Sequence, residues 1–550
     1  MMRNGSGALA ILIVVTSSLI CGFLGGRMAT GPVPPRPDEF PGSFIEALDV
    51  IQRNYVDKIE ADRLFYSAIK GMLHALDPHS SFFDPREFAR LREEQRSSYF
   101  GVGANVRRLR RDSGRVVIIE PPVPESPAAR SGLRAGDVIT HIGGEAIDNL
   151  TRDEVVDRLH GPHGSWVTIT AERLGVRNPL QFKVERDEIP IPSVPHAFEV
   201  SPGTGYIKID RFSESTAAEL NQKLESLAPA RLSGLILDLR NNPGGLLSQA
   251  IDVADLFLAR GQMIVSTKGR ARSSAKIYRA PSRGRIRIPV VVLINGQSAS
   301  ASEIVAGALQ DHDRALILGE TSFGKALVQS VYSLGNVTGM ALTTARYYTP
   351  SGRQIQRDYS GTLLDYYYLG GGLARAGEPR EVRQTDSGRK VLGGGGITPD
   401  LEVPDRKLNH FETLLSSQYI FFEYALRLAS GQTAAAGNFR LPLNRAEVRP
   451  RPDRSPVPIP DPEITDAILT DFKDYLRSRN IEFKEDDIQE NIDFIKRGIK
   501  QEVYTSAFGR LAGVKIAIQA DNQVKKAIEL LPEASLLMTT GHTSLRALQK

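Results

Sequence analysis

The sequence is nearly free of cysteine. Its single thiol, Cys21, lies within residues 8–24, an uncharged apolar run bounded by arginines. The rest of the chain can therefore form no disulfide and needs no thiol chemistry. This run is intermediate in length between a signal-peptide core and a membrane span. We expect residues 1–28 to form an uncleaved anchor, with the bulk of the protein on the periplasmic side of the inner membrane of a bacterial cell envelope. Lipidation of Cys21 is the alternative, although the preceding Ile20 is bulky for a lipoprotein signal.

Histidine and blocks of like charge are also scarce. The chain has nine histidines, without an HExxH motif or a paired-histidine spacing, so we expect no metal site and no cofactor. The net charge is +5 over 550 residues. The basic cluster Arg107–Arg111 lies between strand-like segments, where a solvated strand face explains it better than nucleic acid does. We therefore expect no nucleic-acid partner.

What the chain does contain is a succession of segments with different periodicities. With 550 residues it is too long for one hydrophobic core. Apolar spacings of three and four predict helices towards both ends, and strands alternate with helices between them. We predict a multidomain α/β protein with these divisions: anchor 1–28, Pro-rich linker 29–42, helical region 43–95, small β domain 96–188, α/β domain 189–405, helix and Pro-rich linker 406–462, and helical domain 463–550.

The small β domain carries two informative motifs. "YFGVGANV" is an aromatic-Gly-x-Gly strand entry, and "SPAARSGLRAGDVITHIGGEAI" is a small-residue helix followed by a glycine-rich turn and a strand. Together they resemble a PDZ domain. The Gly101–Gly103 loop can turn its N–H groups towards the terminal carboxylate of a peptide that adds as a strand beside it. We predict a carboxylate site at Phe100, Gly101, Val102 and Gly103, and a β domain without a ligand is the alternative.

Two small-residue loops follow apolar strands in the α/β domain. "NNPGG" comes after "GLILDLR", and "GQSASASEI" comes after "PVVVLI". In a sheet covered on both faces, ligands bind beyond the carboxyl ends of the strands, where both loops lie. Ser300 is a candidate nucleophile there. The spacing Ser300-x-x-Glu303 is also a capping box, which alone would explain the serine as a helix N-cap; Ser302 or Ser298 as the cap would leave Ser300 free.

A serine nucleophile requires a base, and histidine is the usual one. Only His312 is near these serines in sequence; it stands twelve residues after Ser300, roughly 18 Å along a helix, and we interpret it as a solvated helix end. A lysine can serve if burial lowers its pKa from about 10.4. Lys325 follows a glycine and is flanked by apolar residues. The amide oxygen of Gln329, four residues later, can orient its amine.

Six motifs together resemble the carboxyl-terminal processing proteases, or tail-specific proteases, of the serine–lysine S41 type. They are "LDPHSSFF", "DLRNNPGG", "SASASEI", "GETSFGKALVQ", "ARYYTPSGRQIQ" and "GITPD". The resemblance covers residues 43–405 and implies a crotonase- or ClpP-like α/β peptidase core with an inserted PDZ domain. In this family the lysine lies 25 residues after the middle serine, as in this sequence (325 − 300 = 25). The roles that the resemblance implies are Ser300 as nucleophile, Lys325 as base, Gln329 as supporting amide, and the backbone N–H groups of Ala301 and of Gly244 or Gly245 as oxyanion hole.

We therefore predict an exported, membrane-anchored serine endopeptidase that cleaves proteins near their C-termini. The PDZ domain is expected to capture the substrate tail and to gate access to the site. Longer family members carry a helical C-terminal domain associated with assembly, so we also expect a homo-oligomer through the C-terminal helices, and possible partners include an adaptor protein. Two alternatives remain, an inactive PDZ scaffold or chaperone and a crotonase-like acyl-CoA enzyme. The intact set of Ser300, Lys325 and Gln329 argues against the first, and export with a PDZ-like domain argues against the second.

Overall fold

A computed structural model describes residues 40–109, 114–227, 232–282, 284–335, 337–367, 380–433, 435 and 463–543. The predicted anchor with Cys21 lies outside these residues, as does most of the linker that follows it. None of the described helices has the length and hydropathy needed to cross a bilayer. The chain divides into two compact units, Met1–Leu76 and Asp77–Lys550, and each is described by itself.

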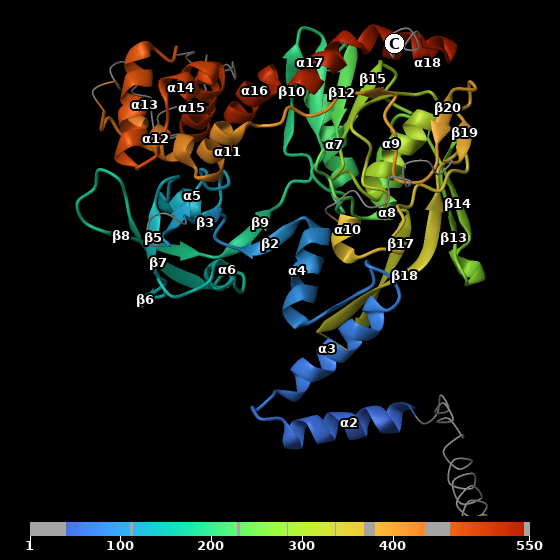
Figure 1. Cartoon of the computed structure of the whole chain (residues 1–550), viewed down its shortest axis with the longest axis horizontal. Coiled ribbons are helices and arrows are strands. Elements are labelled where there is room, and N and C mark those ends of the chain that lie inside the picture. Colours follow the sequence, from blue (N-terminus) through green and yellow to red (C-terminus); the bar gives the residue numbers. More distant parts are fainter. Residues whose placement is uncertain are drawn as a thin grey trace, which may run out of the picture. The chain divides into compact units, whose positions relative to one another are not determined.

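The described part of the first unit consists of two helices. They are α2 (Phe40–Asn54) and α3 (Ala61–His74), and Figure 1 shows both in blue. Each was predicted from apolar side chains that recur at spacings of three and four. The helical periodicity of this region is therefore confirmed.

The second unit opens with a strand that the sequence did not predict. β1 (Ser81–Phe83) pairs antiparallel with β18 (Thr338–Tyr348), with Phe82 opposite Met340. Helix α4 (Pro85–Arg96) follows and begins with a capping box formed by Asp84 and Glu87. Residues 43–95 are thus not wholly helical, because "SSFF" finds its partner strand far along the chain.

The small β domain is a six-stranded antiparallel sheet with two short helices. Its strand order is β3-β4-β5-β7-β8, and β6 pairs with β5. Ile118, Ile139 and Ile169 from the sheet pack with both helices in one apolar core. A separate ribbon of β2 and β9 joins the two ends of the domain. These elements are β2 (Ser98–Gly101), β3 (Val106–Arg108), β4 (Val116–Ile118), α5 (Pro127–Ser131), β5 (Val138–Ile142), β6 (Glu145–Ala146), α6 (Arg152–Leu159), β7 (Trp166–Glu172), β8 (Leu180–Glu185) and β9 (Asp187–Pro190).

A second six-stranded sheet forms the centre of the α/β domain. Its order is β10-β11-β12-β15-β16-β21, and every pair is parallel except β10 with β11. β12 and β15 are buried along their whole length, as expected for a parallel sheet covered on both faces. The strands are β10 (His196–Ser201), β11 (Thr204–Lys208), β12 (Gly234–Asp238), β15 (Val290–Ile294), β16 (Leu316–Gly319) and β21 (Leu401–Glu402).

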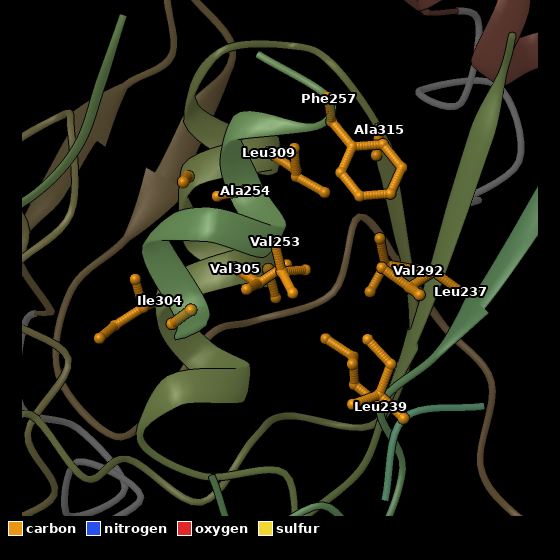
Figure 2. Close-up of a cluster of buried hydrophobic side chains, with 14 of the residues drawn as sticks. Leu237, Leu239, Val253, Ala254, Phe257, Val292, Ile304, Val305, Leu309 and Ala315 are labelled. Carbon is orange, nitrogen blue, oxygen red and sulfur yellow. The ribbon is translucent and has the colours of Figure 1, made fainter. Parts of the chain in front are cut away.

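Helices cover both faces of this central sheet. Leu235 and Leu237 of β12 belong to the apolar cluster on one face, whereas Ile236 belongs to the cluster on the other, because successive strand residues point to opposite faces. Figure 2 shows the first cluster, in which Val253, Val305 and Leu309 from two helices face Leu237 and Val292 of the sheet. The helices on this face are α7 (Thr216–Ser226), α8 (Leu247–Asp255) and α9 (Ala301–Asp311).

A smaller sheet lies at the side of the α/β domain and includes β1. Its order is β1-β18-β13-β14, with β17 on the other edge of β18. The remaining elements of this region are β13 (Met263–Lys268), β14 (Lys276–Arg279), β17 (Leu327–Leu334), the one-turn helix α10 (Leu363–Tyr367), and the hairpin of β19 (Val382–Gln384) and β20 (Lys390–Leu392).

The C-terminal helices divide between two apolar clusters. One cluster is formed by α11 (His410–Ser417), α12 (Ile420–Ala429), α13 (Asp466–Ser478), α14 (Glu485–Glu490) and α15 (Ile492–Phe508). The second face of the central sheet is covered by α16 (Arg510–Ala520), α17 (Asn522–Glu529) and α18 (Leu531–Thr540). The helices predicted as one domain, residues 463–550, thus contribute to two cores. The single helix predicted at the start of residues 406–462 is two helices, α11 and α12, because Tyr419 between them adopts a left-handed conformation.

Candidate active site

One cleft brings together the residues predicted for catalysis. It has a volume of about 1030 Å³ and lies where the chain leaves the carboxyl ends of β12 and β15. The predicted residues on its wall are Ser300, Ala301, Lys325, Gln329, Gly244 and Gly245. The cleft therefore occupies the position at which open α/β sheets bind their ligands.

The three serines of the loop after β15 have different surroundings. The Ser298 hydroxyl donates to the carbonyl oxygen of Leu239 at 2.9 Å, and the Ser302 hydroxyl donates to that of Asn242 at 3.0 Å. Both side chains are fully buried, and both fasten the loop to the turn that follows β12. Of these three serines, Ser300 lines the cleft; it stands at the N-cap position of α9, where the Glu303 carboxylate accepts from its N–H.

Ser300 has a strained backbone. Its φ of 53° and ψ of −112° lie in a region that side-chain-bearing residues rarely adopt, at a cost on the order of 1–3 kcal/mol. Two bonds to its carbonyl oxygen, from the N–H groups of Glu303 (2.9 Å) and Ile304 (3.0 Å), hold this conformation. Such strain is typical of residues whose side chain has to be aimed at a site.

Glu303 joins the serine loop to the lysine loop. Its carboxylate is fully buried, and one oxygen, Oε2, accepts hydrogen bonds from the N–H groups of Ser300 (2.8 Å) and Lys325 (2.9 Å). The other oxygen accepts from the N–H of Gly324 (2.7 Å) and from the Ser322 hydroxyl (2.5 Å). Burial raises the pKa of Glu303, and these four donors oppose the rise. Sequence reasoning noted Glu303 only as a capping residue.

Lys325 stands in the apolar surroundings that its neighbours in the sequence predicted. Ala326 and Leu327, which follow it, are buried. Burial lowers the pKa of Lys325 from its ordinary value of 10.5, and the negative charges of Glu303 and Asp77 work in the opposite direction. Ser300 and Lys325 share Glu303 as a hydrogen-bond partner, and each donates to it through its backbone N–H. Catalytic side-chain bonds are often long in a site without substrate and tighten when one binds.

Gln329 lies on β17, where a bulge separates it from Val328. Its Nε2 donates to the hydroxyl of Thr343 at 3.2 Å. This bond engages the amide nitrogen and leaves the amide oxygen, which is the atom predicted to orient the Lys325 amine.

His79 is a cleft residue that sequence reasoning set aside, because it precedes the α/β domain in the chain. It stands just before β1, and the pairing of β1 with β18 carries it to the cleft wall. Its Nε2 lies 2.6 Å from the Tyr366 hydroxyl. Burial, and after it the charge of Lys325, lowers the pKa of His79 to about 4. The imidazole is therefore neutral at pH 7. The motif "LDPHSSFF" marked this segment, but the long-range pairing is not readable from one sequence.

The two glycines of "NNPGG" differ in what their N–H groups can do. The N–H of Gly244 donates to the side-chain oxygen of Asn242 at 2.9 Å. Within the described chain, no acceptor is recorded for the N–H groups of Gly245 and Ala301. A Cβ on Gly244 would lie 2.7 Å from that of Ser300, and one on Gly245 would lie 2.0 Å from the carbonyl oxygen of Phe212. The turn therefore approaches the serine closely only because both residues are glycine.

The prediction that His312 is a solvated helix end is wrong. Only 8% of its side chain is exposed. Its Nδ1 lies 2.7 Å from the Asp386 carboxylate, and its Nε2 lies 2.7 Å from the carbonyl oxygen of Met263. The His312 side chain is thus largely covered at the end of α9 and bonded to a loop and to the edge of β13.

A buried ion pair supports the turn that carries the two glycines. The Arg240 guanidinium bonds to the Asp238 carboxylate at 2.7 Å and to the Asp521 carboxylate at 2.8 Å, and it also donates to Gln523 at 2.8 Å. Burial alone would raise the pKa of Asp238, but the charges of Lys208 and Arg240 hold it below its usual range. The turn beside the cleft is thus bonded to the start of α17.

The predicted carboxylate loop of the small β domain has one exposed aromatic residue. Phe100 is 44% exposed, whereas Val102 is buried. The carbonyl oxygens of Val102 and Gly103 accept backbone hydrogen bonds from Ala128 and Val123. Within the described chain, no acceptor is recorded for the N–H groups of Val102 and Gly103. Gly103 has a φ of +82°, and a Cβ there would lie 2.4 Å from that of Ser126.

Comparison with known proteins gives matches to two family models and to curated relatives. Residues 203–367 match peptidase family S41, and residues 118–173 match the PDZ domain. The carboxy-terminal-processing protease of Bartonella bacilliformis is 42% identical over 318 residues, which cover 57% of this chain and 72% of that protein. The carboxy-terminal processing protease CtpB of Bacillus subtilis is 32% identical, covering 60% of this chain and 68% of that one. The chloroplastic C-terminal processing peptidase of Tetradesmus obliquus is 33% identical, covering 57% and 74%.

These matches confirm the resemblance and the fold class predicted from the motifs. The S41 match contains both small-residue loops and Lys325, and the PDZ match lies within the small β domain. The chain belongs to the carboxy-terminal processing proteases of peptidase family S41, and it is a serine peptidase with a PDZ domain.

Proposed function

We propose that this protease cleaves protein substrates near their C-termini through a dyad of Ser300 and Lys325, supported by Gln329. The neutral Lys325 amine accepts the proton of the Ser300 hydroxyl while the oxygen attacks the scissile carbonyl carbon. The tetrahedral intermediate expels the amine of the C-terminal fragment, to which the Lys325 ammonium donates its proton, and leaves an acyl-enzyme and a neutral Lys325. Lys325 then takes a proton from water, which attacks the ester carbonyl; the second tetrahedral intermediate expels the Ser300 oxygen, which regains its proton from Lys325, and releases the remaining product as a carboxylic acid.

The oxyanion of each tetrahedral intermediate is bound by the N–H groups of Ala301 and Gly245. Both groups are without a recorded acceptor in the described chain, whereas the N–H of Gly244 is committed to Asn242. Ala301 is also the first residue of α9, and a helix N-terminus favours negative charge. Gly244 contributes the close approach of the turn to Ser300.

The observation that carries this proposal is the shared carboxylate oxygen of Glu303. The N–H groups of Ser300 and Lys325 bind one atom at 2.8 and 2.9 Å, although the two residues are on separate elements. A catalytic pair requires that its backbones be fixed relative to each other, since a misplacement of about 1 Å costs on the order of a hundredfold in rate. The bond from Ser300 is also the reciprocal bond of a capping box, but a helix cap does not require the second bond, from the N–H of Lys325.

The dyad is tested by substituting its two members in the full chain. Ser300→Ala and Lys325→Ala are each expected to abolish cleavage of an unstructured protein with a free C-terminus, while the thermal unfolding transition persists. Lys276→Ala, at an exposed lysine on β14, is the matched control and is expected to cleave normally. Unchanged cleavage by Ser300→Ala would place the nucleophile elsewhere. Wild-type protein that binds substrates but never cleaves them would favour the inactive scaffold.

We propose further that residues 100–103 bind the C-terminal carboxylate of the substrate. The PDZ match, the exposed Phe100 and the two N–H groups of Val102 and Gly103 support this role. The test uses Ser300→Ala protein and a peptide with either a free or an amidated C-terminus. Amidation is expected to weaken binding at least about tenfold. Equal affinities would show that the carboxylate is not recognised.

We also propose that residues 1–28 anchor the enzyme in the inner membrane with its body on the periplasmic side, and that the C-terminal helices assemble it into a homo-oligomer. The apolar run at residues 8–24 supports the anchor. Deletion of residues 1–28 is expected to move the protein from the membrane pellet to the soluble fraction.

Light scattering on the intact chain measures the subunit number, and a monomer at all concentrations would contradict self-association. An adaptor protein remains a further proposed partner.

A further inference from the structure

Tyr347 connects the nucleophile loop to the lysine loop at their carbonyl groups. Its hydroxyl donates to the carbonyl oxygen of Lys325 at 2.7 Å and, more weakly, to that of Ser300 at 3.2 Å. One phenolic proton is thus shared between the two residues that we propose as base and nucleophile. Tyr347 itself also lines the cleft.

The tyrosine is rigidly placed. Only 1% of its surface is exposed, and it belongs to the main apolar cluster of the α/β domain. Its own N–H donates to the carbonyl oxygen of Ala326 at 2.9 Å, so Tyr347 binds two successive carbonyl groups, those of Lys325 and Ala326. Burial raises the pKa of Tyr347 well above 10, and the hydroxyl therefore stays a donor throughout the working pH range.

Tyr347 and Glu303 act on opposite sides of the same two residues. The Glu303 carboxylate accepts from the N–H groups of Ser300 and Lys325, and the Tyr347 hydroxyl donates to their carbonyl oxygens. Each peptide segment is therefore bound before and after its side chain. With both ends fixed, rotation of the side chain alone remains to bring the Lys325 amine to the Ser300 hydroxyl.

We propose that Tyr347 is a positioning residue that sets the distance between the Ser300 hydroxyl and the Lys325 amine and keeps that amine in its water-poor environment. This inference rests on the proposed dyad. Without the hydroxyl, the carbonyl of Lys325 loses its short hydrogen bond in a buried setting, and the lysine loop is free to relax towards the open cleft. This relaxation increases the distance between the Ser300 hydroxyl and the Lys325 amine, and it exposes the amine to water.

The test is Tyr347→Phe, which removes one oxygen and keeps the ring that fills the core. The matched control is Tyr348→Phe in the next position of β18, where the ring lies under the Lys268 amine at 4.9 Å and points to the other face of the strand. We expect kcat to fall ten- to a hundredfold in Tyr347→Phe, with KM within about twofold of wild type. Tyr348→Phe should match wild type in both constants.

The pH profile separates positioning from mere stability. The base acts in its neutral form, so activity is lost as the pH falls through its pKa. A better hydrated amine has a higher pKa, and the acidic limb of kcat/KM is therefore expected at higher pH in Tyr347→Phe. The rate at which a fluorophosphonate labels Ser300, counted per folded molecule, provides the same comparison if the variant is partly unfolded.

Three outcomes decide the inference. A fall in kcat with a displaced acidic limb supports it. Activity within twofold of Tyr348→Phe overturns it, as does a fall that only follows the unfolded fraction while the acidic limb and the labelling rate per folded molecule stay unchanged. If Ser300→Ala or Lys325→Ala is active, the proposed dyad itself fails; if both are inactive and Tyr347→Phe is active, only the role of Tyr347 fails.

Discussion

At the scale of single residues, the site depends on a lysine amine that is buried although its charged form favours water. Lys325 is charged in water, and burial lowers its pKa in the folded chain. The carboxylates of Glu303 and Asp77 limit this effect. The reactivity of the site is therefore a balance between loss of water around the amine and nearby negative charge.

This balance predicts a pH-dependent gain in stability for Lys325→Met. The unfolded chain holds the lysine proton more tightly than the folded chain does, so the lysine destabilises the fold below the unfolded pKa of about 10.5. Lys325→Met is therefore expected to unfold at a higher temperature than wild type at pH 7, by a margin that shrinks as the pH rises towards 10.5.

Thermal unfolding of Lys325→Met and wild type at pH 7 to 10 measures that margin. Lys276→Met, at an exposed position of β14, should show no pH-dependent margin. A margin for Lys325→Met that does not change with pH would mean that the folded protein does not desolvate the amine.

At the scale of elements, the turn between β12 and α8 leaves no room for side chains at its two glycines. Gly245 has a φ of +144°, and a Cβ there would stand 2.0 Å from the carbonyl oxygen of Phe212. We propose that this turn directs an N–H group at the oxyanion. A side chain at Gly245 would force the turn to move away from Ser300. The contact that excludes a side chain at Gly245 is thus with backbone, which cannot rotate out of the way.

Gly245→Ala is therefore expected to reduce kcat at least about a hundredfold, the usual effect of losing one oxyanion donor. It should also lower the free energy of unfolding by about 2 kcal/mol or more, because the clash is with backbone. Gly261→Ala is the control: its φ is +87°, but nothing lies within 4 Å of its Cβ position. That control should lose about 1–2 kcal/mol and keep full activity. Equal activities of the two variants would show that Gly245 does not shape the site.

Local patterns predicted the strands and loops that build this site. β12 and β15 are continuous apolar runs followed by small residues, and both were found where predicted. Single-sequence patterns missed what depends on distant partners. β1 exists only because β18 pairs with it, and this pairing carries His79 to the cleft. Glu303 was seen as a local cap, although three of its four donors come from residues 322–325.

At the scale of the whole molecule, the C-terminal helices are part of the peptidase core. α17 and α18 cover one face of the central sheet through Val524, Leu531 and Leu537. Arg240, beside the catalytic turn, bonds to Asp521 and Gln523 at the start of α17. A chain ending near residue 405 would therefore expose the apolar face of the sheet, and assembly has to be measured on the intact chain.

Two adjacent leucines of α18 test this role of the tail. Leu537 is fully buried, whereas Leu536 is 41% exposed. Leu537→Ala is expected to lower the free energy of unfolding by about 2–5 kcal/mol, and Leu536→Ala by less than about 0.5 kcal/mol. Chemical denaturation monitored by far-ultraviolet circular dichroism measures both losses. Equal losses would show that α18 does not pack on the sheet.

The strand pair of β1 and β18 has a consequence for the biosynthesis of this enzyme. The cleft wall is drawn from residues between His79 and Tyr347, with the PDZ domain inserted after the first of them. A nascent chain that has emerged only as far as Ser300 carries the nucleophile but neither its amine nor the strand that seats His79. Cleavage therefore has to wait until β18 has been translated, and the helices that cover the central sheet and bond to Arg240 are made last of all.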